Sequence, residues 1–166
     1  MSKAFTSEET EDPGPVGRAP PRAGETRPIT REGKRALEAG LRELQSTRAA
    51  LGAGFQDLSA IELAARKEEL ERKEELLSAI LATVIEVATP ADRTRVSFGC
   101  TVTVEDERGK KRRYTLVGPD ETDAKAGRIS AASPLGRALL EQKVGDEVEL
   151  ERPRGNELIT VRAIKV

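Results

Sequence analysis

The spacing of apolar residues changes from a helical to a strand-like period at Pro90, and this change constrains the fold more than any other feature of the 166-residue chain. Before Pro90, leucines recur at intervals of three, four or seven residues, which is typical of an amphipathic helix. After Pro90, apolar residues alternate with small or polar ones, as in a strand with one buried face. We therefore expect an α+β fold in which a helical unit precedes a sheet domain.

The segment from 29 to 90 predicts two antiparallel helices that form a coiled-coil hairpin. Thr30 can cap the first helix, because a threonine hydroxyl accepts a hydrogen bond from the first helical turn. The glycines within residues 52–54 interrupt the pattern and allow the chain to reverse, and the second helix is expected to begin near Asp57 or Ser59. Each helix has a narrow apolar stripe that needs the other helix to cover it. The stripe residues are Leu37, Leu41, Leu44 and Leu51, then Leu63, Leu70, Leu77 and Val84, with Ile80 and Leu81 beside them.

Charged residues enter the seam of the second helix in the half nearer the turn. One seam position falls on Arg66 or Lys67, and the next falls on Lys73 or Glu74. We expect the hairpin to pack more weakly toward its turn, because these side chains prefer water to an apolar seam.

Residues 91 to 166 predict an antiparallel sheet with one short helix. Two runs of alternating residues flank a polar turn at Arg108 and Gly109, which is the pattern of a β-hairpin. Ser133 is expected to cap the helix with Pro134 at its first position, because the missing proline N–H has no helical partner there anyway. The expected strands are 96–104 and 113–117 in the hairpin, then 128–131, 148–150 and 158–164.

Residues 1 to 28 are expected to form a disordered, proline-rich tail. They hold five of the nine prolines and few aliphatic residues, so they cannot bury enough apolar surface to offset the entropy lost on ordering. The expected organisation is therefore a tail over 1–28, a coiled-coil hairpin over 29–90 and a sheet domain over 91–166.

The composition excludes several kinds of chemistry. The chain has no histidine, and its single cysteine, Cys100, has no partner for a disulfide or a metal site. Four aromatic residues are too few for a platform that stacks nucleic-acid bases. No apolar run approaches the roughly twenty residues that cross a bilayer, and a net charge of −1 gives weak general attraction to nucleic acid. We expect a cytoplasmic protein with no cofactor of its own and no membrane contact.

Several blocks of residues resemble the Gre family of bacterial transcription elongation factors. The blocks occur in the family's order and at near-family spacing, and the opening residues MSKAFT are closer to the GreB branch than to GreA. They are VSFGCTVTV at 96–104, YTLVGPDE at 114–121, RISAASPLGRALL at 128–140 and VGDEV at 144–148, and ITREG at 29–33 resembles the start of the family's first coil helix.

This resemblance implies a partner and a geometry. Family members dock a carboxyl-terminal domain with an FKBP-like fold on the rim of the RNA polymerase secondary channel, and their coiled coil enters the channel toward the catalytic Mg²⁺. In cleavage-stimulating members, acidic residues at the coil tip help to hold a second Mg²⁺, and polymerase then hydrolyses the backtracked transcript. The resemblance therefore implies a monomeric regulator, not an enzyme, that binds bacterial RNA polymerase and shares at most polymerase-bound Mg²⁺.

The expected tip of the coil departs from the family pattern. The family motif reads approximately GDLSEN, and the matching residues 56–61 here are QDLSAI. Asp57 matches the first acid, but Ala60 replaces the second, and Glu62 lies two positions further on, about 200° round a helix. Asp57 could supply one shared Mg²⁺ ligand or only begin the second helix, and we expect a first helix about one heptad shorter than the family's. We expect transcript cleavage to be weak or lost, and the alternative is a fully cleavage-stimulating factor that uses Asp57.

Four residues match the region with which family members contact polymerase, and the resemblance implies the same role here. They are Asp120, Glu121, Ser133 and Pro134. Related members carry an acidic residue just before the Ser-Pro pair, whereas this chain has Ala132, so we expect weaker or altered docking. Ser133 and Pro134 could equally serve only to begin a helix.

Two other classes of function are kept as alternatives. A nucleic-acid-binding module would contact transcript phosphates through a basic cluster at the hairpin turn, but three neighbouring acidic residues favour a solvated turn. A prolyl isomerase is suggested by the FKBP-like fold alone, and the domain offers only Phe98 and Tyr114 for a proline pocket. The basic cluster consists of Arg108, Lys110, Lys111, Arg112 and Arg113.

Overall fold

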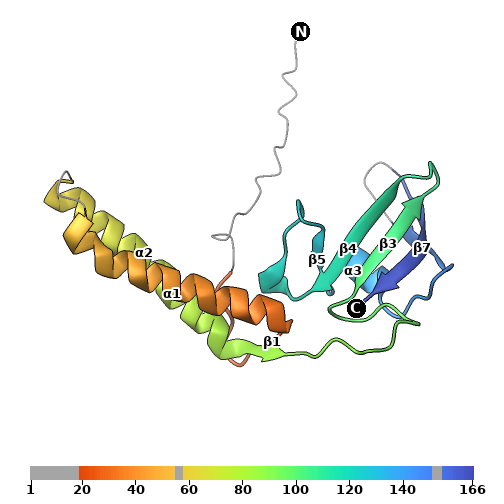
Figure 1. Cartoon of the computed structure of the whole chain (residues 1–166), viewed down its shortest axis with the longest axis horizontal. Coiled ribbons are helices and arrows are strands. Elements are labelled where there is room, and N and C mark those ends of the chain that lie inside the picture. The colour runs from red at the N-terminus through yellow and green to blue at the C-terminus, as the bar shows by residue number, and fades with distance from the viewer. Residues whose placement is uncertain (1–18, 55–57, 151–154) are drawn as a thin grey trace, which may run out of the picture.

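The computed structural model describes residues 19–54, 58–150 and 155–166, and Figure 1 shows a long helical hairpin that projects from a small sheet domain. Helix α1 spans Arg31–Gly54 and helix α2 spans Ala60–Thr83. The two helices pack against each other and do not lie flat on the sheet (Figure 1). The predicted α+β fold, with a helical hairpin ahead of a sheet domain, is therefore confirmed.

Both helices begin at a hydroxyl side chain that satisfies free backbone donors. The Thr30 Oγ1 atom accepts a hydrogen bond from the Gly33 N–H at 3.0 Å, as an N-cap does. At the start of α2, the Ser59 Oγ atom accepts from the Glu62 N–H at 3.3 Å, and the Glu62 carboxylate accepts from the Ser59 N–H at 2.9 Å. This reciprocal pair is a capping box, and it makes Ser59 the cap of α2. Asp57, the other predicted start, lies outside the described residues.

The apolar seam of the hairpin is packed most completely at its base, next to the sheet domain. Ile29, Leu37 and Ile80 are fully buried there, and burial of each such side chain stabilises the fold by about 1.5–3 kcal/mol. Nearer the tip, Glu74 is buried in the seam, and its carboxylate lies 3.1 Å from the Arg48 Nε atom across the hairpin. Leu51 and Leu70 are buried in this half as well. The Arg48 side chain is 40% exposed, so its pair with Glu74 contributes little, and the seam of the tip half is less purely apolar than that of the base. The residues that pack around the buried base are Leu76, Leu77, Leu81 and Val84.

The sheet domain contains five strands in the order β5-β4-β3-β7-β6. Strand β3 pairs with β4 as the predicted hairpin, and β7 pairs antiparallel with β3 and with β6. Strand β5 lies parallel to β4, so the sheet is mixed and not purely antiparallel as predicted. The chain leaves β4 through a 3-10 turn, η1, and returns in the same direction, which the alternation of apolar residues cannot reveal. The bounds are Thr101–Asp106 for β3, Lys111–Val117 for β4, Pro119–Glu121 for η1, Arg128–Ser130 for β5, Glu147–Leu150 for β6 and Glu157–Lys165 for β7.

Helix α3, Pro134–Leu139, packs against this sheet and begins as predicted. The Ser133 Oγ atom accepts from the Gly136 N–H at 3.0 Å, and the proline occupies the first helical position. Leu139 is fully buried in the sheet core, whose buried members are aliphatic apart from Cys100. The short helix therefore both closes the core and leaves its first turn near the surface.

A second, two-stranded sheet joins the two ends of the hairpin. Strand β1, Arg27–Ile29, runs parallel to β2, Val84–Glu86, and the Val87 N–H donates to the Ile29 carbonyl at 2.8 Å. The sequence placed residues 27 and 28 in the tail, but both lie in β1. A strand of three residues with a central proline is too short to show an alternation of apolar and polar residues, and its partner strand is distant in the chain. No local sequence pattern therefore indicates β1. Both helices consequently share one base.

The packing at this base predicts a large loss of stability when Ile80 is truncated. Ile80→Ala should lower the free energy of unfolding by about 2–5 kcal/mol, because the side chain is fully buried between the helices. Ile85→Ala, at a side chain that is 55% exposed, should cost less than about 1 kcal/mol. Urea unfolding followed by circular dichroism measures both, and equal losses would contradict the packing described.

Candidate functional site

The tip of the hairpin presents an apolar surface where the sequence predicts a degenerate acidic site. Ala60 is exposed at the first position of α2, and Ile61 beside it is 82% exposed. Within residues 58–62, Glu62 is the one acidic residue. Asp57, the residue that could supply a Mg²⁺ ligand, lies outside the described residues, as does Gln56.

The Glu62 carboxylate is engaged in the cap of α2. Its Oε2 atom accepts hydrogen bonds from the Ser59 N–H at 2.9 Å and from the Ser59 hydroxyl at 2.7 Å. The hydroxyl, followed by the backbone N–H, holds the pKa of this carboxyl below its ordinary value of 4.5. An oxygen that accepts two hydrogen bonds is less available to coordinate a cation. The structure therefore gives Glu62 a structural use that the sequence motif did not indicate.

Asp120 and Glu121, two of the residues predicted to contact polymerase, are buried against the base of the hairpin. Their exposed fractions are 4% and 7%. Glu121 accepts hydrogen bonds from the Thr30 N–H at 2.9 Å, from the Thr30 hydroxyl and from the Arg128 guanidinium at 3.1 Å. Asp120 forms a buried ion pair with Arg27 at 3.0 Å. Both carboxylates thus face inward, because buried charges need partners and the hairpin base supplies them.

Sequence reasoning missed the partners of these acids. Thr30 and Glu121 are 91 positions apart, and Arg27 and Asp120 are 93 apart. No periodic pattern links residues at such distances. One available signal was Arg27 itself, a basic residue four positions before the first residue of α1, where a positive charge does not favour the positive end of the helix dipole.

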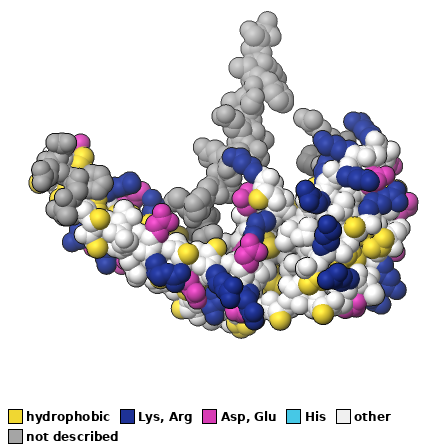
Figure 2. Space-filling view, viewed as in Figure 1, with side chains coloured by type: hydrophobic (Ala, Val, Ile, Leu, Met, Phe, Trp, Pro, Cys, Tyr) yellow, Lys and Arg dark blue, Asp and Glu magenta, His cyan; other side chains and the backbone are white. Residues whose placement is uncertain are grey.

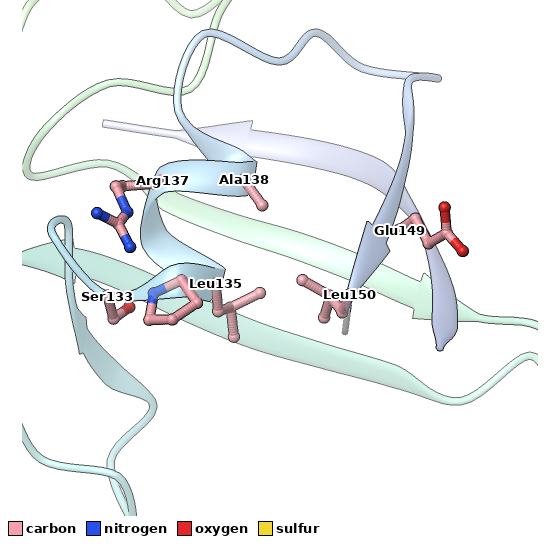
Figure 3. A pocket seen from close by; sticks show the side chains of 7 residues that line it. Ser133, Leu135, Arg137, Ala138, Glu149 and Leu150 are labelled. Atoms are coloured by element: carbon pink, nitrogen blue, oxygen red, sulfur yellow. The ribbon is translucent and has the colours of Figure 1, made fainter. Parts of the chain in front are cut away.

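Ser133 and Pro134 border an open groove of about 510 Å³ between α3 and β6 (Figure 3). The Ser133 hydroxyl donates to the Ser130 carbonyl at 2.6 Å, while the proline ring is exposed. Leu135 and Leu150 approach each other across the groove, and the charged groups of Arg137 and Glu149 point away from it (Figure 3). These two predicted residues can therefore both begin α3 and offer a surface. The lining residues are Ser133, Pro134, Leu135, Arg137, Ala138, Glu149 and Leu150, and none of them is aromatic.

Two of the five side chains of the basic cluster at the β3–β4 turn, Lys111 and Arg112, are paired with acidic side chains. The Arg112 guanidinium lies 3.6 Å from both the Asp106 and the Glu157 carboxylates, and Lys111 lies 3.9 Å from Glu105. Asp106 also accepts the backbone N–H groups of Arg108 and Lys110, at 3.0 and 2.9 Å. Figure 2 shows basic side chains spread over this face of the domain, with fewer acidic side chains among them. Arg113 is exposed on β4. The structure thus favours a solvated, charge-compensated turn over a phosphate-binding surface.

The described ranges contain neither a membrane-spanning helix nor a cluster of metal ligands. No helix among residues 19–54, 58–150 and 155–166 is long and apolar enough to span a bilayer. The same part of the chain contains no group of three or more Cys, Asp or Glu side chains placed to hold a metal ion.

The fold places this chain in the class of proteins with a projecting helical hairpin joined to a small sheet domain. Comparison with known proteins identifies its family. Residues 90–166 match the family described as transcription elongation factor, GreA/GreB, carboxyl-terminal. GreB of Pseudomonas aeruginosa is 38% identical, and the match covers 84% of this chain and 90% of that protein. GreB of Xanthomonas axonopodis pv. citri is 37% identical, and the match covers 87% of this chain and 94% of that protein. The chain belongs to the Gre family of transcription elongation factors.

A solved structure of a related protein has a looser geometric likeness. GreA factor homolog 1 (Gfh1) of Thermus thermophilus is 26% identical, with 86% of this chain and 99% of that one covered and a TM-score of 0.41. That score is too low for a comparison of geometry. Family membership confirms the predicted resemblance and the expectation of an elongation factor instead of an enzyme. The shortened coil and the degenerate tip stay predictions.

The capping box predicts how the Glu62 carboxyl titrates. Because its pKa is lowered in the folded state, the stabilisation from this cap is complete above pH 4.5 and is lost as the pH falls through the lowered value. Ser59→Ala should move the pKa of Glu62 back up toward 4.5, since it removes the hydroxyl donor. Carboxyl-carbon NMR titration measures the shift. Ser78→Ala, an exposed site on α2, is the control, and an unchanged Glu62 titration in Ser59→Ala would contradict the geometry.

Proposed function

We propose that this chain is a Gre-type regulator that binds bacterial RNA polymerase, docks its sheet domain on the rim of the secondary channel and places its coiled coil inside. It would act on paused or backtracked complexes, with stimulation of transcript cleavage weak or lost. The observation that carries this proposal is the tip of α2. Ala60 stands where the family motif has an acid, and the nearest acid, Glu62, is held in the helix cap.

The chemistry of transcript cleavage explains why this tip matters. Mg²⁺ prefers hard oxygen ligands in octahedral geometry, and a second ion in the polymerase site needs such ligands from the factor. The Ala60 methyl group supplies none. Asp57 alone would leave the factor with one carboxylate in place of two. The tip could still occupy the channel, because α1 has 24 residues and a helix of that length extends about 36 Å.

The α3 groove is the surface that best supports docking. Pro134 is exposed at the start of α3, and Leu135 and Leu150 provide an apolar floor with charged residues at its edge. An apolar centre with a polar rim is the usual form of a protein-binding surface. The absence of an aromatic residue from the described lining argues against the prolyl isomerase alternative. We therefore place the polymerase contact at Ser133 and Pro134, and the action of the protein in the bacterial cytoplasm.

Restoring the second acid should restore cleavage. Ala60→Glu should increase the rate of transcript shortening in backtracked elongation complexes by at least about tenfold, since groups that support a metal site are commonly worth that much. Ile61→Glu is the matched control: it adds the same charge one position along, about 100° round the helix. Equal stimulation by the two variants would show that charge alone matters, and strong cleavage by the wild-type protein would contradict the proposed loss.

The docking surface has a separate test. The double variant Ser133→Ala with Pro134→Ala should reduce the amount of polymerase that the protein captures in a pull-down, while the thermal unfolding of the sheet domain remains cooperative. Val144→Ala, at a side chain that is 56% exposed elsewhere on the domain, should leave capture unchanged. If the double variant captures as much polymerase as the wild type, the groove is not the contact.

A further inference from the structure

The turn η1 presents two adjacent buried carboxylates to the base of the hairpin. Asp120 and Glu121 belong to the sheet domain, whereas Arg27 and Thr30 belong to the first strand and the first cap of the hairpin. We call these four residues, together with Arg128, the coil-base junction. This junction joins the two parts of the molecule through charge and hydrogen bonds, in contrast to the apolar core of each part.

Glu121 is the centre of the coil-base junction. Its carboxylate accepts four hydrogen bonds: from the Thr30 N–H and hydroxyl, from the Gly118 N–H at 3.0 Å and from the Arg128 guanidinium at 3.1 Å. Thr30 is the N-cap of α1, so this negative charge also lies at the positive end of the helix dipole. A charge from one part of the protein therefore completes the helix start of the other.

Asp120 holds the strand that precedes α1. Its Oδ1 atom accepts a hydrogen bond from Arg27 Nη1 at 3.0 Å. The same guanidinium donates to the Glu25 carboxylate and to the carbonyl groups of Ala19 and Pro20, at 3.2 and 3.3 Å. Arg27 is 9% exposed. The guanidinium thus contacts both the segment that precedes the coil and the sheet domain. Its planar set of N–H donors suits arginine to such buried sites.

Two glycines allow the parts to approach this closely. A Cβ atom added at Gly33 would lie 1.9 Å from the Glu121 Oε1 atom, and one added at Gly118 would lie 1.9 Å from the Pro28 carbonyl oxygen. Neither φ value of these residues requires glycine, so the requirement is for space. The junction is therefore closely fitted as well as hydrogen-bonded.

Because β1 pairs with β2 at the base of the hairpin, the contacts between the coil-base junction and β1 hold both helices. Strand β1 precedes α1 and pairs with β2, which follows α2, from Arg27 opposite Val84 to Ile29 opposite Glu86. An orientation imposed on β1 and Thr30 is consequently imposed on the whole coil. Arg128 also forms an ion pair with Glu32 of the hairpin, at 3.5 Å. The Glu32 side chain is 83% exposed, so this pair adds little stability.

We propose that Asp120 and Glu121 are positioning residues, which fix the direction of the coiled coil relative to the sheet domain, and that they do not contact polymerase themselves. The functional consequence rests on the function proposed above: a coil held in one direction can enter the channel when the sheet domain docks. The orientation itself is a property of the free protein. It can therefore be tested without polymerase.

A distance measurement in the free protein tests the orientation. Spin labels on Ser46→Cys in α1 and Lys143→Cys in the sheet domain are both at exposed positions, and Cys100 is fully buried, so it does not compete for label. The junction predicts one narrow distance distribution in the wild type and a broad one in Glu121→Ala. Glu147→Ala removes an exposed carboxylate from β6 and is the matched control. A narrow, unshifted distribution in Glu121→Ala would overturn the proposal.

Gly33→Ala provides a second variant, whose substitution lies in α1 and not in the sheet domain. Its Cβ should displace the Glu121 carboxylate, so it should broaden the same distribution and lower the Tm. In the Glu121→Ala background the obstructing atoms are gone, and Gly33→Ala should no longer lower the Tm, because alanine is the better helix former. An equal loss of Tm in both backgrounds would contradict the contact. This cycle decides the question even if Glu121→Ala perturbs the sheet domain.

Competition on polymerase separates positioning from direct contact. If Glu121→Ala leaves the entry-competent direction in about one tenth of molecules, its apparent affinity in competition with a cleavage-competent Gre factor falls about tenfold. Direct contact predicts the same loss without any change of distance in the free protein, and that result would overturn the proposal. Unchanged competition together with a broad distribution would also overturn it. Failure of the wild-type protein to bind polymerase would refute the proposed function, while the distance measurement would still decide the orientation.

Discussion

The hydrogen-bonded contact between the Glu121 carboxylate and Thr30 is the interaction on which the shape of this protein depends. Each of the two parts has its own apolar core, and neither core extends into the other. Without the buried acids of η1, the hairpin would be attached to the sheet domain mainly through chain connectivity and an exposed ion pair. A buried carboxylate with four donors is directional in a way that apolar packing is not, because its hydrogen bonds specify angles as well as proximity.

Acidic residues are used differently at the base of the coil and at the described part of its tip. At the base, the buried Glu121 carboxylate accepts hydrogen bonds through both oxygens, and Asp120 is paired with Arg27 through its Oδ1 atom. At the described part of the tip, Ala60 and Ile61 are exposed, and the one acid there caps the helix. If the base is rigid as proposed, a tip whose described residues offer no free carboxylate suits a factor that occupies a channel more than one that supplies metal ligands. This combination links the family fold to the proposed loss of cleavage.

The fold could be predicted from the sequence wherever local chemistry decides it. The leucine stripe, the caps at Thr30 and Ser59, and the proline at the start of α3 each depend on neighbouring residues. The parallel pairings of β4 with β5 and of β1 with β2 depend on residues far apart in the chain, and alternation carries no information about strand direction. For the site, the sequence singled out Asp120 and Glu121 as polymerase contacts, and this role stays untested. Their burial was not foreseen, since the partners Arg27 and Thr30 precede them by more than ninety positions.

The central claim is that the hairpin and the sheet domain form one oriented body in solution because η1 holds the coil base. Residual dipolar couplings of backbone amides in the free, full-length protein test this most directly, since they report the orientation of every helix and strand in one frame. The account predicts that a single alignment tensor fits α1, α2 and the strands β3 to β7 together, with the orientation in Figure 1. Two tensors of different magnitude, one for the hairpin and one for the sheet, would contradict it.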